Sequence, residues 1–222
     1  MQAQAETIQP SVHPDQPPKV VQRVILHGVS WETYERLLAD FQDSHAAHFA
    51  YDQGVLEIMA PSAEHERPNR TIALFVEEIA VEMGIDVDNV GSNTFKRADL
   101  ARGFEPNTCF YIHNAKRVKG KERIDLAVDP APDLVIEIDI TSPSLNKFPI
   151  FAALGIPEVW RYDGATVTIF RLEQGEYRTQ EQSAEFPGLT SQVITQFLEN
   201  NRSTPRSTWM RSIHEWARQQ KN

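Results

Sequence analysis

Three acidic side chains interrupt the otherwise apolar segment 132–140, at Asp133, Glu137 and Asp139. If this segment is a strand, its side chains alternate, so the three carboxylates share one face and the leucine and isoleucines between them form the other. Burying a carboxylate costs roughly several kcal/mol of folding free energy unless the group is protonated, hydrogen-bonded or bound to a cation. Oxygen ligands of this kind suit a divalent metal ion, so the pattern predicts a metal site.

A plainer interpretation stays open for two of these carboxylates. In it, Asp133 caps the start of the strand after Pro132, and Asp139 lies at the solvent-exposed end. Glu137 is then the one acidic residue whose burial still needs a chemical reason.

Bulk composition narrows the class of protein. The chain has 222 residues and is 41% hydrophobic, which suffices for one domain with a substantial core. No apolar run is long enough to cross a bilayer, and the first residues lack the basic start and apolar stretch of a secretory signal. The single cysteine, Cys109, excludes a disulfide framework and a cysteine-based zinc site. A cytoplasmic protein without a membrane partner is expected.

The formal charge of −9 argues against broad attraction to nucleic acid, because phosphate binding draws on lysine and arginine. One local basic segment runs from Lys116 to Arg123 and includes Lys119 and Lys121. It is either a loop that grips a nucleic-acid backbone or an ordinary solvated hairpin turn around Gly120.

The N-terminal half supplies the first elements that must position these residues. Residues 1–22 are rich in Gln and Pro and poor in large apolar side chains, which predicts a disordered tail. The pattern then predicts, in order, a helix after Ser30, a hairpin around 52–54, a helix from Ser62 to Gly84, one or two strands within 85–95, a polar loop through 97–102 and a strand at 107–113.

The C-terminal half follows the acidic strand. A short helix is expected to begin near Pro149 and end at Gly155. The later pattern predicts an antiparallel meander of strands at 158–162, 166–172 and 176–180, then helices at 189–198 and 207–218. The last helix places Trp209 and Trp216 on one face, either for docking onto the body of the protein or for a dimer contact. Helices on both sides of a mixed sheet indicate a single α/β or α+β domain.

Three blocks of the sequence carry a resemblance. They are Gly103–Ile112, Pro132–Glu137 with Ser142-Pro143-Ser144, and the spaced residues Lys147, Phe151, Gly155 and Pro157–Trp160. Together they resemble the Uma-two family of restriction-endonuclease-like proteins, a branch of the PD-(D/E)XK nuclease superfamily. The resemblance implies an α/β restriction-endonuclease-like fold, with a mixed β-sheet flanked by α-helices, over residues 23–202. Residues 203–222 would add an amphipathic C-terminal helix.

The resemblance also implies a site. In the superfamily, an Asp on one strand and a Glu or Asp with a Lys on the next hold one or two magnesium ions. Carried onto this chain, Glu137 matches the second-strand carboxylate, Asn107 stands where the family has Asp, and Asp139 stands where the superfamily has Lys. The implied ligands for Mg²⁺, or Mn²⁺ as its substitute, are therefore Asn107, Glu137 and Asp139. Lys147 is the nearest replacement for the missing lysine, although lysines before helices are often merely solvated.

Superfamily members often add a Glu from an N-terminal helix, and Glu64 and His65 begin the corresponding helix here. A simpler interpretation is that acidic residues in a first helical turn favour the helix dipole, with Ser62 as the cap. The structure around this turn must decide between a ligand and a cap.

Lys96, Arg97, Lys119 and Lys121 are the candidates to bind a nucleic-acid backbone. For Arg97 the alternative is an ion pair on the surface with nearby Asp99.

The function implied is magnesium-dependent hydrolysis of phosphodiester bonds in DNA, by a protein expected to be a homodimer. Asn107 offers a carbonyl oxygen but no negative charge, so it should weaken metal binding. The alternative is a catalytically degenerate nuclease fold that serves as a DNA-binding or protein-interaction module. A purely structural protein is a third class, in which replacing Glu137 changes stability alone.

Overall fold

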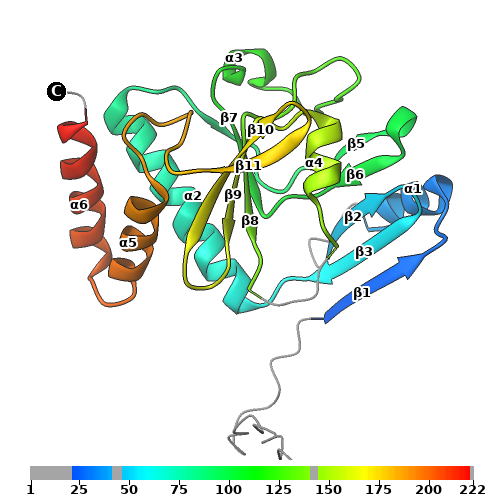
Figure 1. The fold of residues 1–222 in the computed structure, drawn as a ribbon, viewed down its shortest axis with the longest axis horizontal. Coiled ribbons are helices and arrows are strands. Elements are labelled where there is room, and N and C mark those ends of the chain that lie inside the picture. Colours follow the sequence, from blue (N-terminus) through cyan, green and yellow to red (C-terminus); the bar gives the residue numbers. More distant parts are fainter. Residues whose placement is uncertain (1–21, 42–46, 141–144, 221–222) are drawn as a thin grey trace, which may run out of the picture.

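A computed structural model describes residues 22–41, 47–140 and 145–220 and places them in two β-sheets with flanking helices (Figure 1). The first sheet is antiparallel and contains β1 (Gln22–His27), β2 (His48–Asp52), β3 (Val55–Ala60), β5 (Phe95–Arg97) and β6 (Arg102–Phe104). Their order across the sheet is β1-β3-β2-β6-β5. The sequence predicted one mixed sheet, so this separate antiparallel sheet was not expected.

The second sheet is mixed and carries the acidic segment. It contains β4 (Asp88–Asn89), β7 (Thr108–Tyr111), β8 (Leu134–Ile138), β9 (Glu158–Tyr162), β10 (Val167–Glu173) and β11 (Glu176–Gln180). Its order is β11-β10-β9-β8-β7-β4, with β8 and β9 parallel and the other pairs antiparallel. The central position of β8 explains why residues on both of its faces are buried.

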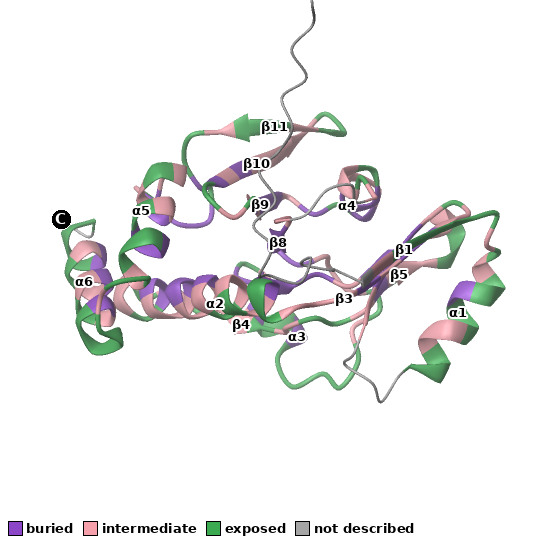
Figure 2. Cartoon of the chain, turned by 90° about the horizontal axis from the view of Figure 1, so that it is seen from below, coloured by how far each residue is buried: buried purple, intermediate pink, exposed green. Residues whose placement is uncertain are grey.

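The helices divide between the sheets. They are α1 (Trp31–Asp40), α2 (Ala63–Met83), α3 (Ala115–Val118), α4 (Phe148–Leu154), α5 (Ser191–Asn201) and α6 (Arg206–Gln219). As Figure 2 shows, α1 lies against the first sheet while α2, α5 and α6 gather on the second. A third core, between the sheets, contains α4 with residues of β6, β7 and β8. The fold class predicted from the sequence is therefore confirmed.

Local sequence signals fix several boundaries. The Ser30 hydroxyl accepts a hydrogen bond from the backbone N–H of Thr33 and caps α1, as expected. Helices α2 and α4 each end at a glycine with left-handed backbone, Gly84 and Gly155, where other residues would be strained. The predicted hairpin at β2 and β3 and the meander of β9, β10 and β11 are also present.

One expectation for the loops was wrong and another was incomplete. The basic segment forms the short helix α3 and then a turn at Gly120, so it is not a hairpin. The polar loop expected through 97–102 is present as the connection of a β-hairpin. The sequence did not predict β6 after this loop, which pairs with β5 on one side and with β2 on the other. Strand β6 forms because it pairs with β2, which is distant in the sequence, and the polarity of neighbouring residues does not reveal such pairing.

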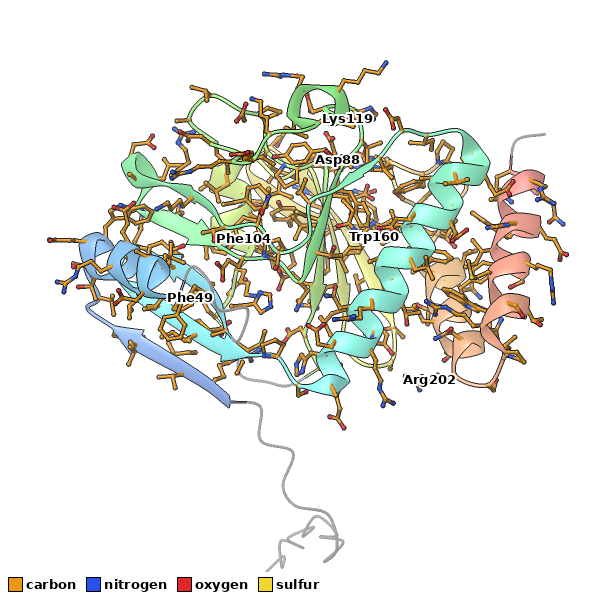
Figure 3. All side chains as sticks on the ribbon, turned by 180° about the vertical axis from the view of Figure 1, so that it is seen from behind. Phe49, Asp88, Phe104, Lys119, Trp160 and Arg202 are labelled. Carbon is orange, nitrogen blue, oxygen red and sulfur yellow. The ribbon has the colours of Figure 1, made fainter. Side chains whose placement is uncertain are left out.

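The tryptophans of α6 dock onto the protein body. Helix α6 lies alongside α2 and α5 (Figure 3). Trp209 is fully buried and its indole N–H donates to the Phe197 carbonyl at 2.7 Å, and Trp216 packs against the ring of Phe197. The docking interpretation is confirmed, and a dimer contact at this helix stays a prediction. The expected tail and Ser142-Pro143-Ser144 lie outside the described residues, apart from Gln22, which begins β1. No helix of the described chain is both long and apolar enough to cross a membrane.

Candidate active site

Glu137 lies near the end of β8 and is only 7% exposed. The strand alternates as its sequence predicts, but both faces pack against apolar residues. Leu134, Ile136 and Ile138 face the core beside α2, whereas Val135 belongs to the core between the two sheets. Glu137 shares the face of Val135, so its carboxylate lies at the margin of the core between the two sheets.

Lys147 is the immediate partner of Glu137. It occupies the N-cap position of α4, and its Nζ donates to Glu137 Oε2 at 2.7 Å. Both side chains are almost buried, and that of Lys147 is 12% exposed. The alternative of a solvated lysine is therefore wrong.

Burial governs the protonation of this pair. It raises the pKa of Glu137, an effect that Lys147 opposes and that Glu57 and Asp139 reinforce. Burial works against the charge of Lys147, yet the nearby carboxylates of Glu137 and Glu57 raise the pKa of this lysine above its usual value. Lys147 therefore holds its proton at neutral pH.

The second oxygen of Glu137 has no hydrogen-bond partner. Oε1 is buried, and none of the described residues donates to it. Such an oxygen costs about 1–3 kcal/mol when left unsatisfied, so its position calls for a ligand. A divalent metal ion fits this atom because a carboxylate oxygen is the ligand that such an ion prefers.

Asn107 connects the two strands of the predicted site. Its side-chain oxygen accepts a hydrogen bond from the backbone N–H of Ile138 at 2.8 Å. Its backbone carbonyl accepts one from Asn69 Nδ2 at 3.1 Å. The structure thus brings Asn107 next to the end of β8, immediately beyond Glu137. The amide oxygen is already engaged with backbone, which limits what it offers to a metal.

Asp139 follows β8 and is partly exposed, with its backbone N–H donating to the Tyr162 carbonyl at 2.8 Å. It is close enough to Glu137 to raise the pKa of that residue. Within the described residues, no three His, Cys, Asp or Glu side chains form a group that could hold a metal. Two carboxylates, those of Glu137 and Asp139, line the same cavity.

Two charged residues of the first sheet reach this site, and the sequence analysis missed both. Glu57 of β3 is 1% exposed and accepts from the backbone N–H of Leu145 at 2.7 Å. Arg23 of β1 lies 3.4 Å from the same oxygen, measured from Nε to Oε2. Glu57 interrupts the apolar run of β3 as Glu137 interrupts that of β8, so the same signal was present in the sequence.

These charges surround a cavity of about 490 Å³. Its lining includes five charged residues, namely Arg23, Glu137, Asp139, Lys147 and Arg161. Phe148 and Phe151 supply apolar surface beside them. A small cavity that combines a buried carboxylate, a protonated lysine and arginines can receive an anionic substrate.

The start of α2 contributes less than expected. His65 is 1% exposed, and its Nδ1 lies 2.9 Å from the Ser62 hydroxyl, while its Nε2 is buried without a hydrogen-bond partner among the described residues. Burial, followed by the charge of Arg23, lowers the pKa of His65. Ser62 occupies the N-cap position of α2, as the capping interpretation expects. Its side chain makes no capping hydrogen bond, however. Neither Glu64 nor His65 lines the cavity of Glu137.

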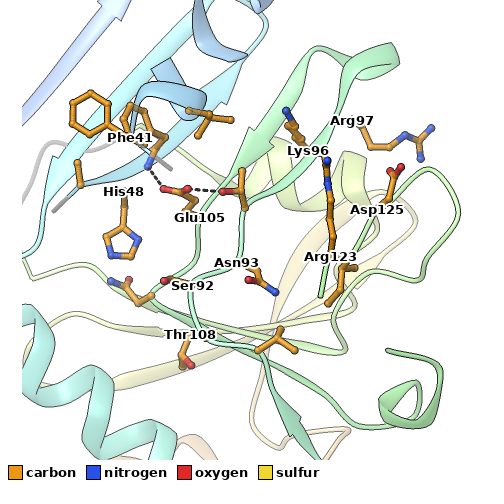
Figure 4. Close-up of a pocket in the computed structure, with 18 of the residues that line it drawn as sticks. Phe41, His48, Ser92, Asn93, Lys96, Arg97, Glu105, Thr108, Arg123 and Asp125 are labelled. Carbon is orange, nitrogen blue, oxygen red and sulfur yellow. Dashed lines mark hydrogen bonds between the residues drawn. The ribbon is translucent and has the colours of Figure 1, made fainter. Parts of the chain in front are cut away.

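A larger cleft, of about 1530 Å³, has Asn107 in its lining, and Figure 4 shows other residues of its wall. Lys96 and Arg97 line it, but each has an acidic partner: Lys96 Nζ lies 2.8 Å from Glu35, and Arg97 makes two bonds of 2.6 and 2.7 Å to Asp99. The surface ion pair expected as an alternative for Arg97 is confirmed. Such pairs leave little net positive charge for a phosphate.

Lys119 and Lys121 follow α3 and line neither cavity, although Glu122 and Arg123, which come directly after them, line the larger one. Lys121 is hydrogen-bonded to Asp129, an interaction that lowers the pKa of that carboxyl group. Lys119 is exposed at the rim of the molecule, as Figure 3 shows. The structure does not bring these two lysines to Glu137.

Comparison with known proteins agrees with this architecture. The model of the Uma2 family, described as "Putative restriction endonuclease", matches residues 31–202. One similar solved structure is that of a protein from Anabaena variabilis titled a "putative nuclease belonging to DUF820". The two are 15% identical, with a TM-score of 0.52 over 77% of this chain and 99% of that one, which is a likeness of fold. No curated protein matches the sequence significantly.

Proposed function

Since the chain belongs to the Uma2 family, we propose that it is an endonuclease that hydrolyses phosphodiester bonds of DNA with a divalent metal ion. The observation that carries this proposal is the Glu137–Lys147 pair in its cavity. One carboxylate oxygen is held by a protonated lysine, and the other is buried with no donor in the part of the chain that the structure describes. No structural need of the fold accounts for that second oxygen.

Each residue has a distinct task in the proposed reaction. Glu137 and Asp139 would hold the ion, with Mg²⁺ expected and Mn²⁺ as its substitute. When bound, the ion would neutralise phosphate charge and lower the pKa of water. Lys147 keeps its proton, so it acts as a fixed positive charge for the anionic phosphate and its transition state. Asn107 aligns the end of β8 through its bond to Ile138.

A second function, a nuclease fold retained for binding alone, is favoured by Asn107. Its side chain brings no negative charge, and its oxygen already accepts a backbone hydrogen bond. Metal affinity should be lower than with an aspartate at this position. DNA is the partner of a nuclease or of a DNA-binding module, whereas a protein-interaction module would bind another protein. The homodimer expected from the resemblance stays a prediction that sedimentation would test.

Plasmid nicking in Mg²⁺ and in Mn²⁺ tests the proposal. The wild type is compared with Glu137→Ala, Asn107→Asp and a matched control, Glu176→Ala, which changes an exposed carboxylate of β11. We expect cleavage by the wild type and by the control, and none by Glu137→Ala. Cleavage that requires Asn107→Asp would support the binding-only function instead. Inactivity of every variant would overturn hydrolysis of duplex DNA.

A further inference from the structure

Arg161 is a charged residue of the small cavity to which neither the sequence analysis nor the family resemblance gives a role. It belongs to β9 and stands beside Glu137 in the parallel register of β8 and β9. Among the described residues it makes no hydrogen bond and no ion pair. A guanidinium always carries its charge and has five N–H donors, so all of these donors are available to a ligand.

Aromatic rings hold this guanidinium in place. Its central carbon lies 5.2 Å from the ring centre of Phe170 and 5.9 Å from that of Phe148. The centres of these two rings are 4.8 Å apart. Contacts of this kind attract a cation without using its N–H groups. The side chain is therefore pre-positioned while its hydrogen-bonding edge stays unfilled.

The charge balance of the cavity indicates what Arg161 binds. Lys147 is paired with Glu137 through a hydrogen bond to Oε2, and Arg23 forms an ion pair with Glu57. Arg161 neighbours Glu137 on the next strand but does not pair with it, although opposite charges so placed would attract. Of the cations that line this cavity in the described chain, Arg161 is the one without an acidic partner.

We propose that Arg161 binds a phosphate oxygen of the DNA backbone and seats the phosphate against Glu137 and Lys147. A planar guanidinium matches two oxygens of a phosphate group, and the rings limit the rotation that would weaken such a contact. This inference rests on the proposed function, because that function supplies DNA as the ligand. It assigns to Arg161 a positioning role that needs no metal, and binding can therefore be measured apart from cleavage.

The test is the binding of a short fluorescent DNA duplex in EDTA, followed by anisotropy between about 50 and 200 mM salt. Arg161→Gln should weaken binding by about tenfold, the loss expected for a charge-assisted hydrogen bond. It should also reduce the slope of log affinity against log salt by about one. Arg161→Lys should keep the slope but lose part of the affinity, because lysine retains the charge without the planar fork.

The matched control is Arg178→Gln, which removes an exposed arginine of β11 that lies 3.8 Å from Glu173. It should bind DNA as the wild type does. The inference is overturned if Arg161→Gln behaves like this control, or if the wild type does not bind DNA. Circular dichroism establishes that each variant is folded, and Arg161→Lys provides the test if the glutamine variant is not.

The two proposals fail separately. If the wild type does not nick plasmid but Arg161→Gln still loses affinity and salt slope, hydrolysis is overturned and the phosphate contact stands. If the wild type nicks plasmid while Arg161→Gln binds normally, only the role of Arg161 is overturned.

Discussion

The two ends of the parallel pair β8 and β9 both bury carboxylates, but they treat them differently. At the amino ends, Asp133 accepts three hydrogen bonds, from the backbone N–H groups of Ile112 and Asn114 and from Asn114 Nδ2. Glu158 likewise accepts three, from Trp160 Nε1, Ser183 Oγ and the backbone N–H of Ala184. These carboxylates join loops to the sheet, and the capping interpretation of Asp133 is thereby confirmed.

At the carboxyl end of β8, the described residues supply Glu137 with a single donor, Lys147, and leave its other oxygen without one. Burial is similar at the two ends, at 5% exposed for Asp133 and 7% for Glu137. Hydrogen bonding is what separates them. A buried carboxylate whose oxygens are fully supplied by backbone and side-chain donors stabilises the fold, whereas one left short of donors beside a cavity is available for chemistry.

The largest expected effect concerns activity at the carboxyl end. Glu137→Gln should lower DNA cleavage by about a thousandfold, because it removes the negative charge that would hold the metal. Stability should also fall, because the amide oxygen still accepts from Lys147 but the buried ammonium loses the charge of its partner. Nicking rates and urea unfolding of the same preparation check both statements. A variant that cleaves normally would remove the distinction between the two ends.

The next effect concerns stability at the amino end. Asp133→Ala should lower the free energy of unfolding by about 3 kcal/mol, because buried donors at Ile112 and Asn114 lose their acceptor. Urea unfolding measures this loss, with Glu181→Ala as an exposed control. The folded fraction should keep the activity of the wild type. Loss of activity without loss of stability would place Asp133 in the reaction instead.

A smaller effect is expected from Asn107→Asp. The aspartate oxygen can still accept from Ile138 N–H, so the fold should persist, and the added charge should tighten Mg²⁺ binding by about tenfold. The midpoint of the thermal shift in a magnesium titration reports this affinity. Asn93→Asp, which adds the same charge at an exposed position of the larger cleft, should leave the midpoint unchanged.

The smallest effect is expected at Glu185, a buried acid near the amino ends of β8 and β9. It lacks the hydrogen-bond donors that Asp133 and Glu158 have in the described chain. Burial raises its pKa to about 7, while His113, 3.0 Å away, opposes that shift. The folded state therefore binds the proton more tightly than the unfolded chain. Stability should fall as pH rises from the ordinary value of 4.5 to about 7.

Glu185→Gln removes this dependence. Relative to the wild type, the variant should gain on the order of 1 kcal/mol at pH values above about 7 and gain nothing at about pH 4. Urea unfolding across this range measures the difference. Equal pH profiles for both proteins would show that Glu185 titrates in the folded state as it does in the unfolded chain.

Local sequence determined much of the fold and one essential residue of the candidate site. The cap at Ser30, the stops at Gly84 and Gly155, and the alternation around Glu137 depend on neighbours within a few positions, where residue type governs backbone and burial. The family likewise follows from the sequence, through the blocks around Asn107, Glu137 and Lys147.

Only the tertiary structure decided which charges meet. Glu57 and Arg23 reach Leu145 and Lys147 across the two sheets, over sequence distances at which no periodic pattern fixes an approach. The sequence shows acids at 133 and 137 alike, but the loops that supply donors to one and not to the other are positioned by non-local pairing. Hydrogen-bond satisfaction is a property of the packed chain, and it is what separates a structural carboxylate from a chemical one.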